Sequence, residues 1–175
     1  MGFASPFCTY KVLFHIPFLF YISCNILFTY YIHKAMNLIP VPLAINRFYE
    51  IVLYPQAGIL GLAWQQPPSP SEYQRGTAAL LEAVHQHHAK KLLSDNSRRG
   101  NPMPQDLVWM THEVVPFLCD QAVQQLALVV PEDPSHARNL EGSLMTSKAC
   151  YELQFFQCHQ EALAWLSSSS GEVQE

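Results

Sequence analysis

Acidic residues are absent from the first 49 positions of this chain, and Glu50 is the first acid. Arginine is absent before Met36 as well, and Gly and Ala are scarce there, whereas ten of the 21 aromatic residues fall in positions 1–35. From Met36 onward the content of Gly, Ala, Pro, Gln and Arg rises. This break in composition predicts an apolar leader at 1–35, followed by a body that is typical of one soluble α/β domain.

Basic residues are few throughout the chain. It has 10 Lys and Arg and a formal net charge of −4. Lys11 and Lys34 precede Met36, so in the body eight basic residues stand against 14 acidic ones, a formal charge of −6. A nucleic-acid-binding surface needs clustered positive charge. The composition therefore indicates that the body does not bind nucleic acid.

Paired cysteine motifs are also missing. The five cysteines are odd in number, and no two of them have the Cys-x-x-Cys spacing of a zinc ribbon. A disulfide framework usually uses an even set of cysteines in a small secreted domain. We therefore expect reduced thiols in a cytoplasmic body. The cysteines concerned are Cys8, Cys24, Cys119, Cys150 and Cys158.

The leader contains 21 consecutive residues, 12–32, without a formal charge. At about 1.5 Å per residue a helix of this length crosses a hydrocarbon core of roughly 30 Å, which favours a transmembrane helix that anchors a cytoplasmic domain. Pro17 and Asn25 lie inside the run and weigh against it. A second interpretation is that residues 1–35 are a spurious extension and that Met36 is the true start, because residues with A/T-rich codons dominate before it. A buried or processed segment is the third, and all three stay open.

Two strands joined by a hairpin are predicted to open the body. Residues 48–54 place every second side chain on one face, and 59–64 repeat the pattern after a Pro- and Gly-containing turn at 55–58. Ser69 then supplies an N-cap, Pro70 suits the first helical position, and Glu72 follows the cap by three residues. This capping box predicts a helix that runs to about residue 87.

Strands and helices are expected to alternate in the rest of the body. Predicted strands are 91–95, 125–130 and 152–157, and the apolar run at 125–130 is typical of a central parallel strand. Predicted helices begin at Pro104, with Pro116 ending or kinking that helix, and cover about 135–149 and 158–166. The expected fold is an α/β domain over 46–168, with a mixed, mostly parallel five-stranded sheet in ββαβαβαβα order and four helices. A disordered tail is expected at 169–175.

Several stretches of the body resemble a known family. They are KKLLSD at 90–95, NSRRG at 96–100, PMPQDLVWM at 102–110, LALVVP at 126–131 and EALAWL at 161–166. Together they look like the STAS domain, the fold of bacterial anti-sigma-factor antagonists, and particularly its small stand-alone relatives from bacteria of the Bacteroidetes type. The resemblance implies a non-catalytic protein-interaction module in bacterial signalling. It also implies a phosphorylatable serine after the third predicted strand, where Ser97 is the nearest hydroxyl.

The candidate site lies where the predicted parallel strands end. In open α/β sheets ligands gather beyond the carboxyl ends of such strands. Asp95, Asn96, Ser97, Arg98 and Arg99 follow one of these strands. Two arginines among loop amides are suited to hold an anion or an acidic loop of a partner. The sequence thus predicts an interaction surface for a protein partner, with Ser97 as its candidate phosphosite, and a small-ligand or anion-binding site as the alternative.

Other chemistry-bearing residues point to neither metal nor catalysis. Trp109, on the helix after this loop, is included in the predicted interaction surface. His85 and His88 can share a helix face, but a zinc site needs three or four ligands, so we expect a solvated helix end. His112 and Glu113 lack the spacing of a metalloprotease motif. We therefore expect no enzyme activity, metal or cofactor, and the sequence leaves the oligomeric state open.

Overall fold

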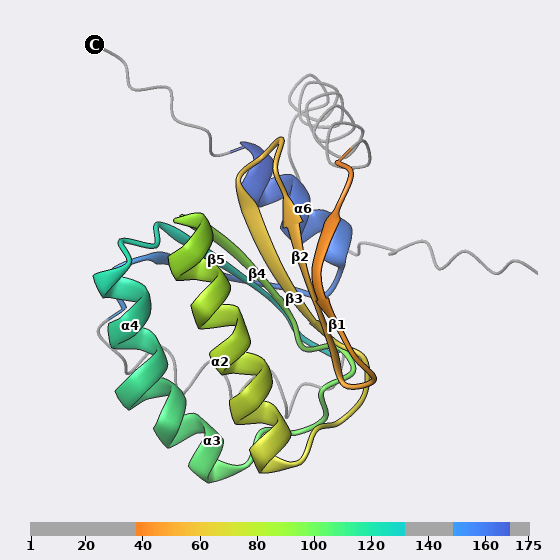
Figure 1. Ribbon diagram of the computed structural model, residues 1–175, viewed down its shortest axis with the longest axis vertical. Helices are drawn as coiled ribbons and strands as arrows, with labels where there is room; N and C mark the ends of the chain where they lie inside the picture. Colours follow the sequence, from red (N-terminus) through yellow and green to blue (C-terminus); the bar gives the residue numbers. More distant parts are fainter. Residues whose placement is uncertain (1–37, 132–148, 169–175) are drawn as a thin grey trace, which may run out of the picture.

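The computed structural model describes residues 38–131 and 149–168, and the described part is an α/β domain with one mixed six-stranded sheet (Figure 1). The strands follow one another across the sheet in sequence order. Their bounds are β1 Val41–Ile45, β2 Tyr49–Tyr54, β3 Ile59–Trp64, β4 Lys91–Asp95, β5 Gln125–Val129 and β6 Glu152–Phe156. The helical elements are α2 Pro70–His87, α3 Pro104–Trp109, the π-helical turn η1 Met110–Val114, α4 Val115–Asp120 and α6 His159–Ser168.

Strands β1 to β3 are antiparallel to one another, and β3 to β6 are parallel. Because parallel strands that advance in one direction are joined by right-handed crossovers, their connecting helices lie on one face of the sheet. Accordingly α2 and the α3–η1–α4 helix lie side by side on one face, whereas α6 covers the other (Figure 1). The predicted hairpin is confirmed, since Tyr54 pairs with Ile59 across the turn.

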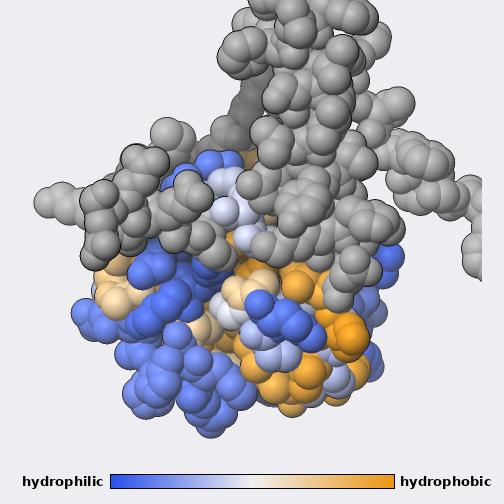
Figure 2. Space-filling model, turned by 90° about the horizontal axis from the view of Figure 1, so that it is seen from above, coloured by the Kyte–Doolittle hydropathy of each residue, from blue (hydrophilic) through white to orange (hydrophobic). Residues whose placement is uncertain are grey.

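The prediction of five strands is wrong, because β1 adds a sixth. Pro42 lacks the N–H that a ladder needs, so the sequence around it does not read as a strand. The structure accommodates it at the sheet edge, with an irregular register between Pro42 and Ala44. Several large apolar side chains along this edge are exposed, with Ile39 68% and Ile45 67% accessible. On the face seen in Figure 2, hydrophobic residues gather mainly toward the right and hydrophilic residues mainly toward the left.

Helix α2 has the bounds that its capping box predicts. The Ser69 backbone N–H donates to Glu72 Oε2 at 2.8 Å, and Ser69 Oγ accepts from the Glu72 backbone N–H at 3.4 Å. The helix ends at His88, which adopts the left-handed conformation at φ 50° and donates its N–H to the Val84 carbonyl. Local side-chain chemistry therefore sets the beginning of this helix.

Next to Pro116 the backbone hydrogen-bond pattern of the second helix changes. Pro116 has no N–H to donate to the preceding turn. The Val115 N–H reaches five residues back, to the Met110 carbonyl, and η1 forms there. The expectation that Pro116 ends or kinks the helix is thus met by a π turn, a common way to absorb such a residue.

The two faces of the sheet carry separate cores. Between the sheet and the helices α2 and α4, Trp64, Leu92 and Val84 are almost fully buried. Between the sheet and α6, Ile59 and Leu166 are fully buried. All five residues of β5 are buried, which confirms the prediction of a strand covered on both faces. Burial on both faces fixes the layer order of helices, sheet and helix.

The prediction of reduced thiols is wrong for Cys119 and Cys150. Cys119 on α4 and Cys150 ahead of β6 form a disulfide, with Cα atoms 5.6 Å apart. Sequence spacing gave no sign of this pair, because 31 positions separate the two residues and only the fold brings them together. Cys158 is a free thiol.

Three sequence predictions fall outside the described residues: the apolar run at 12–32, the helix at about 135–149 except for its last residue, and the tail at 169–175. With α3, η1 and α4 counted as one interrupted helix, the described residues contain three helices, and the fourth predicted helix, at about 135–149, belongs to this group. Within residues 38–131 and 149–168, no helix combines the length and apolar character that a membrane span requires.

Candidate functional site

The loop after β4 divides the predicted site residues between the two faces of the sheet. Side chains alternate along a strand, so Ser94 and Asn96 face α2, whereas Asp95 faces α6. The Asn96 N–H donates to the Val129 carbonyl at 2.8 Å, which ties the loop to the end of β5. Asn96 is buried, and its Nδ2 donates to Ser94 Oγ at 3.2 Å.

Arg99 does not lie on an exposed rim. It is only 3% accessible, and its guanidinium carbon lies 4.0 Å above the centre of the Tyr73 ring. Its Nη2 donates to Asp106 Oδ2 at 3.3 Å, and the same oxygen accepts the Met103 backbone N–H at 3.2 Å. A cation stacked on an aromatic ring and paired with a carboxylate is stabilised inside the protein. The sequence therefore predicted the loop that carries Arg99, but it did not predict that the Arg99 side chain is buried.

The buried pair keeps unused hydrogen-bonding groups. Nε and Nη1 of Arg99, together with Oδ1 of Asp106, are inaccessible to solvent and have no hydrogen-bond partner among the described residues. Leaving such a group unsatisfied costs about 1–3 kcal/mol, and more for a charged group. Unsatisfied buried groups are rare in folded proteins, so these atoms need a physical explanation.

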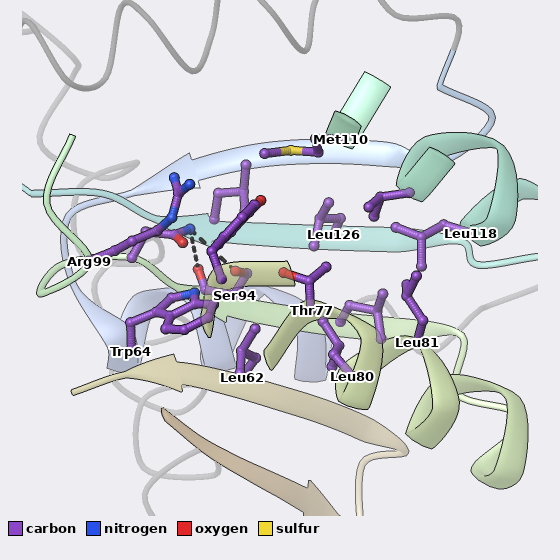
Figure 3. Close-up of a pocket in the computed structure, with 15 residues that line it drawn as sticks. Leu62, Trp64, Thr77, Leu80, Leu81, Ser94, Arg99, Met110, Leu118 and Leu126 are labelled. Carbon is purple, nitrogen blue, oxygen red and sulfur yellow. Dashed lines mark hydrogen bonds between the residues drawn. The ribbon is translucent and has the colours of Figure 1, made fainter. Parts of the chain in front are cut away.

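A cavity of about 60 Å³ adjoins Arg99. It lies between β3, β4 and β5 on one side and α2, η1 and α4 on the other. Arg99, Ser94 and Trp64 lie at one end of it, and Leu81 and Leu118 at the other (Figure 3). The cavity is therefore amphipathic, with hydrogen-bonding groups at one end and aliphatic side chains at the other.

The volume sets the size of any occupant. An apolar cavity of roughly 150 Å³ holds a benzene ring. The 60 Å³ here is less than half of that. At roughly 15 Å³ of probe volume for each water-sized sphere, the cavity holds about four water molecules or a ligand with about four non-hydrogen atoms of similar size.

Sequence analysis missed Tyr73 and Asp106 as members of the site. In the sequence alone Tyr73 looks like an ordinary core residue of its helix, and Asp106 looks like an ordinary first-turn carboxylate. The one available signal was Asp106 itself, an acid that is two positions into a helix and close in sequence to two arginines. Trp109 is half-buried and packs edge-on against Tyr73, with ring centres 6.0 Å apart. It supports the Arg99–Tyr73 stack from outside the cavity lining.

Asp95 belongs to a second cluster on the α6 face. His159 Nδ1 lies 2.9 Å from Asp95 Oδ2, and His159 Nε2 lies 3.4 Å from the Tyr54 hydroxyl. Burial raises the pKa of the Asp95 carboxyl, but hydrogen bonds from His159 and Ser97 outweigh it, so the pKa lies below its ordinary value of 3.8. Burial, followed by the charges of Glu50 and Asp95, raises the pKa of Tyr54. The cluster ties the end of β4 to the first residue of α6.

Ser97 and Arg98 are the exposed members of the loop. The Ser97 hydroxyl donates to Asp95 Oδ1 at 2.6 Å, and its backbone N–H donates to the same oxygen at 3.0 Å. A phosphate on Ser97 would displace the hydroxyl bond and stand beside the Asp95 carboxylate. The Ser97 side chain is therefore exposed to solvent, but its hydroxyl is already hydrogen-bonded to Asp95.

The remaining candidates have local partners. His85 Nδ1 lies 3.0 Å from Gln121 Oε1, and the rings of His85 and His88 meet edge to face. His112 and Glu113 are exposed on η1. Over residues 38–131 and 149–168, no group of three or more His, Cys, Asp or Glu side chains is placed to hold a metal ion.

Comparison with known proteins adds no family. No family model matches this chain, and no curated protein or solved structure matches it. The fold and the site define it as an α/β domain with a mixed sheet and a small amphipathic cavity.

Proposed function

We propose that this domain is a non-catalytic binding protein that holds a small organic ligand in the cavity beside Arg99. The observation that carries the proposal is the cavity itself, which Ser94 and Arg99 line at one end and leucines line at the other. Ligand sites are typically concave and mostly apolar, with a few polar groups that fix the orientation of the ligand. A small ligand bound here places its apolar part against the leucines.

Affinity is limited by the size of the cavity. The best small ligands gain about 1.5 kcal/mol per non-hydrogen atom, so about four atoms gain at most about 6 kcal/mol. That corresponds to a dissociation constant of roughly 40 μM at best. Binding must therefore be sought at millimolar ligand concentrations.

The test is a titration with solutes of four non-hydrogen atoms, followed by the NMR signals of leucine methyl groups. We expect at least one solute to shift the methyls of Leu80, Leu118 and Leu126, which line the cavity. The methyls of Leu163, a buried residue of α6 on the other face of the sheet, serve as the internal reference and should stay in place. If no solute shifts the cavity methyls at about 4 mM, which is 100 times the lowest dissociation constant expected, the proposed function is wrong.

A matched pair of variants localises the binding. Val114 lines the cavity, whereas Val115, the next residue, is equally buried outside it. Val114→Leu adds one methylene to the cavity wall and should abolish the methyl shifts. Val115→Leu adds the same methylene elsewhere in the core and should leave them. Equal effects of both variants would place the binding outside this cavity.

We propose as a second candidate a STAS-like protein-interaction module that uses the same loop. It is supported by the exposure of Ser97 and Arg98 beyond the end of β4. The test is affinity capture by the full chain, with quantitative mass spectrometry of the captured proteins. A true partner should be lost with Arg98→Glu and kept with Arg75→Glu, an equally exposed arginine on α2. A partner that both variants retain, or both lose, contradicts this use of the loop.

A further inference from the structure

We infer that the cavity takes a small apolar molecule, a light hydrocarbon or a dissolved apolar gas, an inference that rests on the proposed ligand-binding function. Eleven of the 15 residues that line the cavity have aliphatic, aromatic or thioether side chains, and seven of them are leucines. The other four are Thr77, Ser94, Asn96 and Arg99. The hydrogen bonds that these four already make decide which kind of ligand the cavity favours.

Three of the polar lining residues are hydrogen-bonded to other protein groups. Asn96 Nδ2 donates to the Ser94 carbonyl at 3.3 Å and to Ser94 Oγ at 3.2 Å (Figure 3). Thr77 shares a side-chain hydrogen bond with Tyr73. The polar groups at this end of the cavity are therefore largely satisfied by one another.

Arg99 adds no accessible unpaired nitrogen to the cavity. Its guanidinium stacks on the Tyr73 ring, and its Nη2 donates to Asp106 Oδ2. Nε and Nη1 have no partner among the described residues, but solvent does not reach them. A ligand atom is at least as large as a water molecule, so a ligand in the cavity does not reach these nitrogens either.

The balance of hydrogen bonds favours an apolar ligand over a polar one. Ser94 Oγ accepts from Asn96 and can still donate one hydrogen bond of its own. A polar ligand gives up several hydrogen bonds to bulk water and recovers at most that one, and a buried water needs two to four polar partners. An apolar molecule gives up none, and it gains by leaving water and by contacting the leucines.

Three planar solutes of four non-hydrogen atoms test the inference: isobutene, acetone and acetate. They share shape and size, and they offer no acceptor, a neutral acceptor and a charged acceptor, respectively. The full-length protein is titrated with each at pH 7, and shifts of the Leu80, Leu118 and Leu126 methyls give the dissociation constants. We expect isobutene to bind at least about tenfold more tightly than acetone and than acetate.

Each outcome bears on one statement. Acetone that binds within tenfold of isobutene overturns the inference in favour of hydrogen bonding to the Ser94 hydroxyl. Acetate that binds within tenfold of isobutene overturns it in favour of an anion site. In both cases the proposed ligand-binding function survives. If none of the three solutes shifts the cavity methyls, the proposed function fails and the inference fails with it.

A matched pair of variants assigns the preference to the cavity wall. Val114→Thr places a hydroxyl in the wall at nearly constant side-chain shape, and Val115→Thr places one in the core outside the cavity. The first should weaken isobutene binding at least about threefold, and the second should leave it unchanged. Equal isobutene affinity in the two variants overturns the inference. Should Val114→Thr fail to fold, Thr77→Val decides, because it removes a lining hydroxyl: isobutene binding must be kept or tightened, and a loss of about tenfold overturns the inference.

Discussion

Arg99 and Asp106 form a buried ion pair, and either charge without its partner would destabilise the fold. Both side chains are almost fully buried, and Nη2 of Arg99 donates to Oδ2 of Asp106. Removing one partner of a buried pair leaves an uncompensated charge in the interior. We therefore predict that Arg99→Met lowers the free energy of unfolding by about 3–5 kcal/mol, measured by urea denaturation.

Adding Asp106→Asn to that variant is the control. The neutral amide removes the stranded charge, so the double variant should recover most of the loss. A double variant as unstable as Arg99→Met alone would mean that the lost stacking on Tyr73, rather than the charge, dominates.

Asp95 makes stability depend on acid pH. Its pKa is lower in the folded protein than its ordinary value of 3.8, through the His159 and Ser97 hydrogen bonds that outweigh burial. A group with a depressed pKa stabilises the fold above its unfolded pKa, and this contribution is lost as pH falls through the folded pKa. We predict that the free energy of unfolding falls less steeply below pH 3.8 in Asp95→Asn than in the native protein. Superimposable pH profiles from urea denaturation would contradict this role of Asp95.

Helix α2 packs closely against the sheet at Gly76, which has no side chain to hold the two apart. A Cβ at this position would lie 2.6 Å from Trp64 Cη2 and 2.8 Å from Tyr49 Cδ1. Both rings are buried and have little room to move. Overpacking costs about 1–3 kcal/mol, whereas the gain in helix propensity from Gly to Ala is only about 1 kcal/mol.

We predict that Gly76→Ala destabilises the protein by up to about 2 kcal/mol, as measured by thermal and urea denaturation. Ala78→Gly, at an exposed position of the same helix, reports propensity alone and should cost about 1 kcal/mol. If Gly76→Ala stabilises the protein, the helix is able to move away from the two rings.

Local sequence predicts those parts of a helix or strand whose hydrogen-bond partners lie close by in the chain. The capping box at Ser69 and the turn after Tyr54 were predicted because their partners lie within a few residues. For Pro116 the sequence predicted the interruption but not its form, since a kink, an end and a π turn all satisfy a missing N–H. Strand β1 was missed because its pairing with β2, not its own composition, makes it a strand.

At the scale of the whole molecule, the Cys119–Cys150 disulfide closes a loop of 31 residues around β5 and the approach to β6. A loop of this length loses conformational entropy in the unfolded chain, which stabilises the fold by about 3–4 kcal/mol. We predict that dithiothreitol lowers the free energy of unfolding by roughly that amount. The Cys119→Ser, Cys150→Ser double variant should be equally destabilised and insensitive to the reductant. A native protein unaffected by dithiothreitol, with both thiols open to alkylation, would contradict the bond.

The sequence by itself determined what short-range chemistry decides: the helix start at Ser69, the β2–β3 hairpin, the doubly buried β5, and the position of the loop that carries Arg98 and Arg99. Each depends on residues a few positions apart, whose periodicity and turn chemistry are visible in one dimension.

Only the tertiary structure decided which of two adjacent arginines is buried, because burial of Arg99 depends on Tyr73 from one helix and Asp106 from another. It also decided that Asp95 meets His159 across 64 positions, and that the packing of α2 and α4 on the sheet leaves an unfilled volume. These features arise from contacts between distant segments, and periodicity along the chain records the face a residue occupies but not what it meets there.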